Sequence, residues 1–149
     1  MISSAETKAI ETGEPLAAAL GCPLEIRSRM HENDRSATGF LPPEEFEAVA
    51  DRFFATPDRS IRGWETARAA QQRIVGEVTG CLEKFTDGDL LFVGHGGVGT
   101  LLYCHFRGVP ISREHDQRPG GGCYLEFCPE DPAGIAGWRP MEEMTGGAA

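Results

Sequence analysis

Apolar side chains recur at helical spacing in three segments of the chain. The first segment opens at Ser3 with the pattern of a capping box, in which Ser3 and Glu6 bond each other's backbone amides, and it stops before Gly21. The second segment covers residues 43–56 and the third covers about residues 65–85. The spacing predicts a helix in each segment, with the first helix starting almost at the first residue.

Shorter segments have the patterns of strands and turns. Residues 24–27 alternate apolar and charged side chains, which is typical of a short strand. Residues 90–93 are a continuous apolar run, as in a central strand covered on both faces, and they lead into a glycine-rich turn and a helix that ends near Gly108. Residues 123–128 form the last predicted strand. The alternation predicts an α/β fold, a three-layer α/β/α sandwich with a mostly parallel sheet.

Two polar loops separate these elements, and a less regular segment follows them. Residues 28–42 are polar and irregular, so we expect an exposed loop that carries function. Residues 112–122 form a basic, glycine-rich loop, and residues 129–149 are expected to be loosely ordered. We therefore predict one domain over residues 1–130 and a C-terminal tail over residues 131–149.

Composition narrows the classes of protein. The chain has 149 residues, 40% apolar and 25% charged, which is ordinary for one globular domain. A formal charge of -9 argues against a nucleic-acid surface, because phosphate backbones need clustered Lys and Arg. No apolar run is long enough for a membrane span and no signal-peptide pattern is present, so the expected location is the cytoplasm. The five cysteines include no Cys-x-x-Cys pair, so neither disulfides nor a zinc or other metal site is expected.

His95 is the clearest candidate for chemistry. It follows a predicted strand, and glycines on both sides let a substrate approach the backbone. The helix that follows would present free amides and a positive dipole to a phosphate beside the imidazole. A histidine merely tolerated in a tight turn is the plainer interpretation. The strand-to-helix context favours the phosphate site.

The same turn has a second interpretation, because Gly94-x-Gly96-x-x-Gly99 after a strand is formally a dinucleotide-binding pattern. That fold requires a second strand ending in an acidic residue. Here Glu114 and Asp116 lie in a loop with no clear strand before them. We therefore rank a nucleotide-binding oxidoreductase fragment below the phosphate site.

Other charged residues can have either a role in binding or catalysis or an ordinary place on the surface. Lys8, in the second turn of the first predicted helix, can reach an anion at that end or lie in solvent. Glu32 can act as a general acid or solvate its loop, and His31 beside it is equally ambiguous. Several arginines can clamp phosphate oxygens or keep loops soluble, and the sequence does not rank them: Arg35, Arg62, Arg113 and Arg118.

Five segments together resemble the histidine phosphatase superfamily, which is phosphoglycerate mutase-like. Residues 3–12 resemble its Ser-Ser-Pro-Leu-x-Arg-Ala-x-x-Thr element, and residues 30–32 its Leu-x-Glu. Residues 63–66 resemble its Gly-Glu-Ser/Thr, and residues 91–98 its Val-x-x-Ser-His-Gly-Gly-Val strand and turn. Residues 122–127 resemble its closing strand. The resemblance extends over nearly the whole chain to about residue 129.

The resemblance implies phosphoryl transfer through a phosphohistidine, whose nucleophile belongs to an Arg-His-Gly motif at the end of the family's first strand. His95 matches the second histidine, Lys8 takes the place of the second arginine, and Glu32 matches the acid. Lys8 and Gly96 are expected to bind a small phosphorylated substrate, and no cofactor is implied. Lys8 would offer a point charge where arginine gives a planar, two-pronged contact.

The main departure from the family is that the chain contains no Arg-His-Gly. We expect that the first strand is missing, that the chain as written forms no phosphoenzyme, and that an apolar strand edge is exposed. Such a chain should be unstable or find a partner, as in a homo-oligomer. A missing N-terminal segment is our preferred explanation; the others are a non-catalytic relative that binds phospholigands or proteins, and a strand supplied by another chain. In its complete form we predict hydrolysis of phosphomonoesters or phosphoryl transfer.

Overall fold

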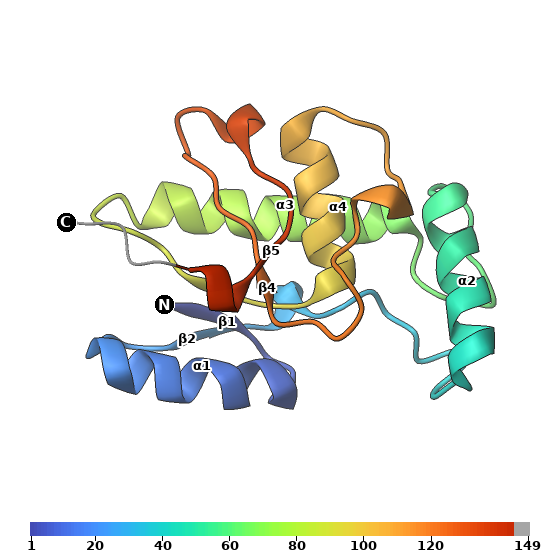
Figure 1. The fold of residues 1–149 in the computed structure, drawn as a ribbon, viewed down its shortest axis with the longest axis horizontal. Helices are drawn as coiled ribbons and strands as arrows, with labels where there is room; N and C mark the ends of the chain where they lie inside the picture. Colours follow the sequence, from blue (N-terminus) through green and yellow to red (C-terminus); the bar gives the residue numbers. More distant parts are fainter. Residues whose placement is uncertain (145–149) are drawn as a thin grey trace.

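A small parallel sheet organises the molecule. The computed structural model describes residues 1–144. Its strands, in the spatial order β2-β1-β3, are β1 (Ile2–Ser4), β2 (Glu25–Arg27) and β3 (Phe92–Val93). Ile2 lies opposite Glu25 on one side and Phe92 on the other, so β1 is the centre of the sheet (Figure 1).

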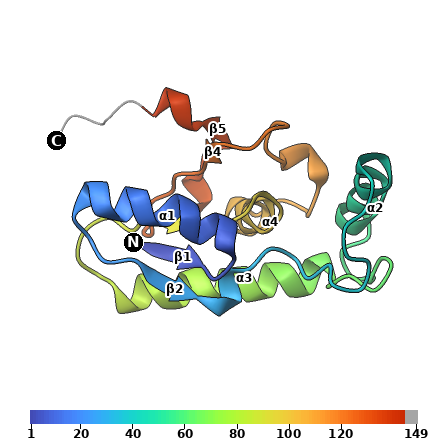
Figure 2. The ribbon, with the colours of Figure 1, turned by 90° about the horizontal axis from the view of Figure 1, so that it is seen from below.

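Helices cover both faces of this sheet. They are α1 (Thr7–Leu20), α2 (Pro43–Ala55), α3 (Ala67–Lys84) and α4 (Gly96–Arg107). Figure 2 shows the strands between α1 and α3, while α2 lies at one end of the molecule. The predicted α/β fold with helices on both faces is therefore confirmed, as are the helices predicted over residues 43–56 and 65–85 to within two residues.

The start of the chain differs from the prediction. Residues 2–4 form a strand, and α1 begins only at Thr7. Glu6 precedes α1 without a side-chain cap, and the predicted capping box is wrong, because the Glu6 amide donates to Ser4 Oγ at 3.3 Å. Ile2, Ser3 and Ser4 are at most 1% exposed. Pairing on both sides of this buried strand outweighs one local cap.

The segment predicted as a central strand, residues 90–93, lies instead at the edge of the sheet. Only Phe92–Val93 is paired, and it pairs with β1 alone. Within the described chain, the outer edge of β3 has no strand partner. Leu91, just before it, is 40% exposed. β3 is thus an edge strand of the described sheet, and the expectation of an exposed apolar edge stays a prediction.

The C-terminal segment packs against α4. Its strands are β4 (Cys123–Tyr124) and β5 (Arg139–Pro140), which pair antiparallel, so the strand predicted over residues 123–128 is shorter than expected. Ile135 is 2% exposed, and Trp138 Nε1 donates to Thr100 Oγ1 at 3.1 Å. The prediction of loose order is therefore wrong for residues 131–143. Residues 145–149 lie outside the described part, and the domain division at residue 130 stays a prediction.

Four 3-10 helices complete the described elements: η1 (Ser28–Met30), η2 (Arg113–His115), η3 (Pro132–Gly134) and η4 (Met141–Glu143). The main core joins Ile2 of β1, Phe53 of α2, Ile74 of α3 and Leu101 of α4, each at most 3% exposed. This core connects α2 to the sheet through α3 and α4. The segments that follow β1, β2 and β3 lie on one side of the sheet, because the carboxyl ends of these parallel strands are at the same edge.

Candidate functional site

His95 lies where two parallel strands end. It lies two residues after the end of β3 and is the N-cap residue of α4, with an extended backbone. Its side chain is 3% exposed, and Nε2 lies 2.8 Å from Ser4 Oγ and 3.3 Å from Glu6 Oε1. Ser4 is the last residue of β1. The strand, turn and helix around His95 are thus arranged as predicted, at the edge where parallel sheets bind ligands.

Burial controls the charge of this histidine. Burial lowers the pKa of His95, and Lys8 and Arg35 lower it further, whereas Glu6 and Glu32 raise it. The net direction is downward, so the imidazole is mainly neutral at pH 7. A neutral imidazole offers one donor and one acceptor nitrogen.

Glu6 is the charged group nearest to His95. Its Oε1 accepts from the Glu32 amide at 2.6 Å, and its Oε2 lies 3.4 Å from Lys8 Nζ. Burial raises the pKa of Glu6, but the Glu32 amide, His95 and Lys8 outweigh burial and the pKa is lowered. Glu6 is therefore an ionised carboxylate in the middle of the site. Sequence reasoning assigned it to a helix cap and missed this position.

Glu32 lies on the N-terminus of α4. Its Oε1 accepts from the amides of Asn33 and Val98, both at 3.0 Å, and its Oε2 accepts from the Gly97 amide at 3.0 Å. The Gly97 and Val98 amides belong to the first turn of α4, where a helix cannot satisfy its amides internally. A Cβ on Gly97 would lie 2.7 Å from Glu32 Oε1, so this close approach requires glycine. All these donors hold Glu32 beside His95.

One cavity is lined by the four residues that the family resemblance assigns to the site. This His95 cavity, about 500 Å³, is lined by Lys8, Glu32, His95 and Gly96, and by residues of the 112–122 loop. Lys8 has a side chain that is 58% exposed. A Cβ on Gly96 would lie 2.0 Å from Gln117 Nε2, so the Gln117 side chain packs directly on this glycine. The structure brings the four predicted residues together; their roles stay predictions.

A second, outer cavity of about 810 Å³ adjoins the first. Glu6, His31 and Phe40 belong to it alone, while Asn33 and Arg35 line both cavities. The Asn33 side chain is buried, and its Nδ2 has no hydrogen-bond partner among the described residues. The two cavities therefore form a continuous region, with an unsatisfied donor near their boundary.

Comparison with known families adds to this geometry. The model of the histidine phosphatase superfamily (branch 1) matches residues 1–132 of the chain. The chain belongs to the histidine phosphatase superfamily. A search of curated proteins found no match.

Solved structures of the same fold include a mycobacterial phosphatase, a protein of Bacillus stearothermophilus and a mycobacterial hydrolase. The mycobacterial glucosyl-3-phosphoglycerate phosphatase in complex with inorganic phosphate has a TM-score of 0.68 and 18% identity, over 93% of this chain and 73% of that one. YhfR of Bacillus stearothermophilus has a TM-score of 0.68 and 20% identity, over 86% and 67%. Mycobacterial hydrolase 1 has a TM-score of 0.63 and 17% identity, over 74% and 59%. The chain thus spans less than two thirds of mycobacterial hydrolase 1.

The histidine phosphatase fold accounts for the glycine pattern better than a dinucleotide site does. After α4, the described chain continues into η2 and then β4, which does not join the parallel sheet. Glu114 lies in η2 and Asp116 just after it.

Residues 1–144 hold no group of three or more His, Cys, Asp or Glu side chains suited to a metal ion. No described helix combines the length and apolar character that crossing a membrane requires.

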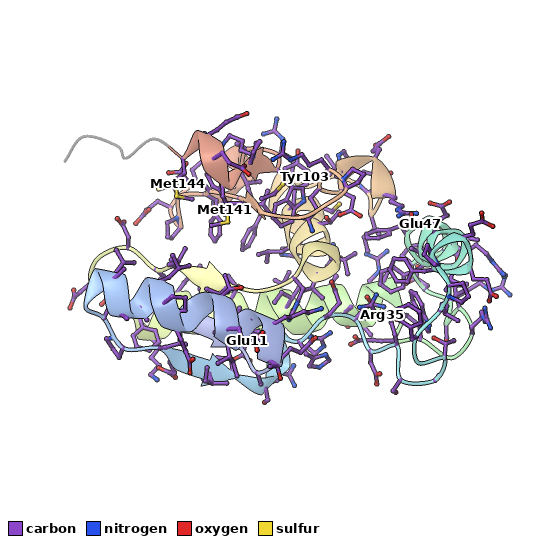
Figure 3. All side chains as sticks on the ribbon, turned by 60° about the horizontal axis from the view of Figure 1, so that its bottom comes forward. Glu11, Arg35, Glu47, Tyr103, Met141 and Met144 are labelled. Carbon is purple, nitrogen blue, oxygen red and sulfur yellow. The ribbon has the colours of Figure 1, made fainter. Side chains whose placement is uncertain are left out.

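The structure ranks the four arginines that sequence left equal. Three are paired with carboxylates: Arg62 with Glu45 at 2.9 Å, Arg118 with Glu142 at 3.2 Å, and Arg113 with Glu47 and Asp51. Arg35 has no carboxylate partner in the described chain, and its guanidinium lies 5.2 Å from the ring centre of Phe46. Figure 3 labels Arg35 and Glu47, which come from the loop before α2 and from α2 itself. Arg35 is therefore the arginine best placed to meet an anion.

Arg73 of α3 is a positioning residue that sequence reasoning missed. It donates to the backbone carbonyls of Arg29 at 2.8 Å, His31 at 2.9 Å and Glu32 at 3.3 Å. It also donates to both carboxylate oxygens of Glu65, at 3.0 and 2.7 Å. Burial raises the pKa of Glu65, but Arg73 outweighs burial and the pKa is lowered. The pair holds the segment that carries Glu32, and in the sequence Arg73 looks like any surface arginine.

Proposed function

We propose that this chain carries the phosphate-binding part of a histidine phosphatase site and that its complete form hydrolyses phosphomonoesters or transfers their phosphoryl group. The observation that carries the proposal is the His95 cavity. It gathers a histidine, a lysine and a helix N-terminus at the carboxyl ends of β1 and β3. Fixed donors of this kind stabilise the charge on the oxygens of a phosphoryl group.

Each predicted residue has a place in this proposal. His95 binds the phosphoryl group, and Lys8 adds a positive charge. The amide of Gly96 makes no hydrogen bond within the described chain, so it is free to donate to a phosphoryl oxygen. The outer cavity receives the rest of a small phosphorylated substrate.

Glu32 is the candidate acid for the leaving oxygen. Three amides hold its oxygens at the terminus of α4. Proton donation would therefore require one carboxylate oxygen to leave these amides. A rotation of the Glu32 side chain would meet this requirement while Arg73 keeps the backbone of the segment in place.

The first test uses titration calorimetry to measure the binding of inorganic phosphate to the purified chain. Wild type should bind phosphate, and His95→Ala should weaken binding about tenfold or more, as expected when a hydrogen bond to a charged group is lost. Hydrolysis of p-nitrophenyl phosphate should appear only in a version that also contains an Arg-His-Gly segment. Equal phosphate binding by wild type and His95→Ala would contradict the proposal.

A second candidate function is a catalytically inactive relative that binds phospholigands or a protein. The observation in its favour is that the 149 residues contain no Arg-His-Gly. Phosphate binding without turnover, even in a version with that motif, would favour this candidate. Turnover that depends on His95 would exclude it.

A further inference from the structure

Lys8 and His95, which are expected to bind a phosphoryl group, already lie beside another anion, the Glu6 carboxylate. Lys8 Nζ lies 3.4 Å and His95 Nε2 lies 3.3 Å from oxygens of Glu6, and the Glu32 amide donates to Glu6 at 2.6 Å. Lys8 and His95 line the His95 cavity, whereas Glu6 lines the outer cavity. The Glu6 carboxylate thus reaches from one cavity to the donors of the other.

A phosphoryl group and this carboxylate compete for the same donors. Both are anions, and two like charges held within a few ångströms of each other in a partly buried site repel each other. Lys8 already contacts an anion, because its Nζ forms an ion pair with Glu6. A ligand that takes Lys8 and His95 must therefore move Glu6 away.

The structure leaves Glu6 room to move. Its side chain is 36% exposed, and it borders the outer cavity of about 810 Å³. Its backbone is held independently of the carboxylate, because the Glu6 amide bonds Ser4 Oγ and its carbonyl accepts from the Ala9 amide. Rotation of the side chain would release the anion position without unfolding α1.

We propose that Glu6 is a built-in occupant of the anion site and that a phosphorylated ligand binds by displacing its carboxylate. This inference rests on the proposed function. The apparent affinity for any anion equals its intrinsic affinity multiplied by the fraction of molecules in which Glu6 has left. Glu6 therefore weakens the binding of every anion by the same factor: a lone phosphate binds weakly, and a ligand that also contacts the outer cavity offsets this loss through those added contacts.

The test uses phosphorus NMR to compare the binding of inorganic phosphate by wild type, Glu6→Gln and Glu14→Gln. Glutamine keeps the size of the side chain and an oxygen that accepts from the Glu32 amide, but it removes the competing charge. Glu14 is an exposed residue on the same helix that lines neither cavity, so its substitution controls for net charge. Glu6→Ala is a second variant, and circular dichroism checks that each variant folds.

Glu6→Gln should bind phosphate about tenfold more tightly than wild type, which corresponds to a site that Glu6 occupies for about nine tenths of the time. Glu6→Ala should change in the same direction, and Glu14→Gln should equal wild type. If wild type binds phosphate and Glu6→Gln binds equally or more weakly, the inference is wrong and the proposed function stands. If no form binds phosphate, the proposed function fails and the inference fails with it.

Discussion

The two loops that enclose the His95 cavity are held in different ways. The first, called here the Glu32 wall, covers residues 29–38. Arg73 bonds three of its carbonyls, the Glu65 amide bonds the Asp34 carbonyl at 2.9 Å, and Trp64 Nε1 donates to Thr38 at 2.8 Å. These contacts come from α3 and the segment just before it. The Glu32 wall is therefore a preformed part of the site.

The second loop, called here the Gln117 wall, covers residues 112–122. It is tied near its start, where Asp116 accepts from Thr100 at 2.9 Å, and at its end, where the Gly122 carbonyl accepts from the Met141 amide at 2.8 Å. Between these ties, no described backbone group bonds the backbone of residues 118–121. Gly120, Gly121 and Gly122 all have positive φ, which other residues rarely adopt. Arg113 also ties the start of this wall to Glu47 and Asp51, whereas few contacts fix residues 118–121, so this part of the wall can adapt to a ligand.

The difference between the two walls predicts which substitutions near the site change the stability of the fold and which do not. Substitutions behind the Glu32 wall should lower the free energy of unfolding, because they break buried charged contacts. Substitutions at residues 118–121 of the Gln117 wall should leave that free energy almost unchanged. Four predictions test this contrast.

The largest effect is expected for Arg73→Ala. It removes donors from the Glu32 wall and leaves the carboxylate of Glu65, whose side chain is 16% exposed, without its partner. Breaking one half of such a pair costs about 3–5 kcal/mol. Urea unfolding measures the change, with the exposed Arg52→Ala as control, expected near zero. A loss below about 1 kcal/mol would show that the Glu32 wall is not held by Arg73.

Glu65→Gln should cost less, about 2 kcal/mol at pH 7, because Arg73 keeps its carbonyl acceptors. It should also change the pH dependence. The folded pKa of Glu65 lies below its ordinary value of 4.5, so the carboxylate stabilises the fold above pH 4.5 and this contribution is lost as pH falls through the folded pKa. Urea unfolding measured from pH 7 to pH 3 should show that the free energy of unfolding declines less steeply for Glu65→Gln than for wild type. Identical pH profiles would contradict the role of the ion pair.

Substitutions of two neighbouring glycines compare the two walls directly. A Cβ on Gly97 meets the Glu32 carboxylate, which three amides hold, whereas a Cβ on Gly96 meets the end of the Gln117 side chain, for which no hydrogen bond is formed in the described chain. Gly97→Ala should therefore cost about 1–2 kcal/mol and Gly96→Ala less than about 0.5 kcal/mol. Thermal unfolding of the two variants provides the comparison. A larger loss for Gly96→Ala would reverse the assignment of the rigid wall.

The smallest effect is expected for Arg118→Ala on the Gln117 wall. Its ion pair with Glu142 is exposed, with side chains 54% and 76% accessible, and such pairs contribute about 0–1 kcal/mol. Thermal unfolding at low and high salt should give the same midpoint as wild type to within the error of the measurement. A clear destabilisation would show that the Gln117 wall is more firmly held than its contacts indicate.

Much of the fold and part of the site followed from sequence. The helices α2 and α3 follow from apolar spacing within one segment, and the His95 turn from glycines between a strand and a helix. Strand β1 did not follow, because Ile2–Ser4 is three residues long and its local pattern is that of a helix cap. Its partners lie at Glu25 and Phe92, far along the chain. Short strands are decided by such pairing more than by their own sequence.

The sequence by itself determined the helices, the His95 turn and the family, because these depend on residues that are neighbours in the chain. Only the tertiary structure decided what the charged residues do. Glu6 bonds the amide of Glu32, 26 positions away, and Arg73 bonds the carbonyl of Arg29, 44 positions away. An ionised side chain on a helix looks the same in sequence whether it meets water or a buried partner. The free energy that distinguishes these two cases comes from desolvation and pairing, and both depend on which distant segments the fold brings together.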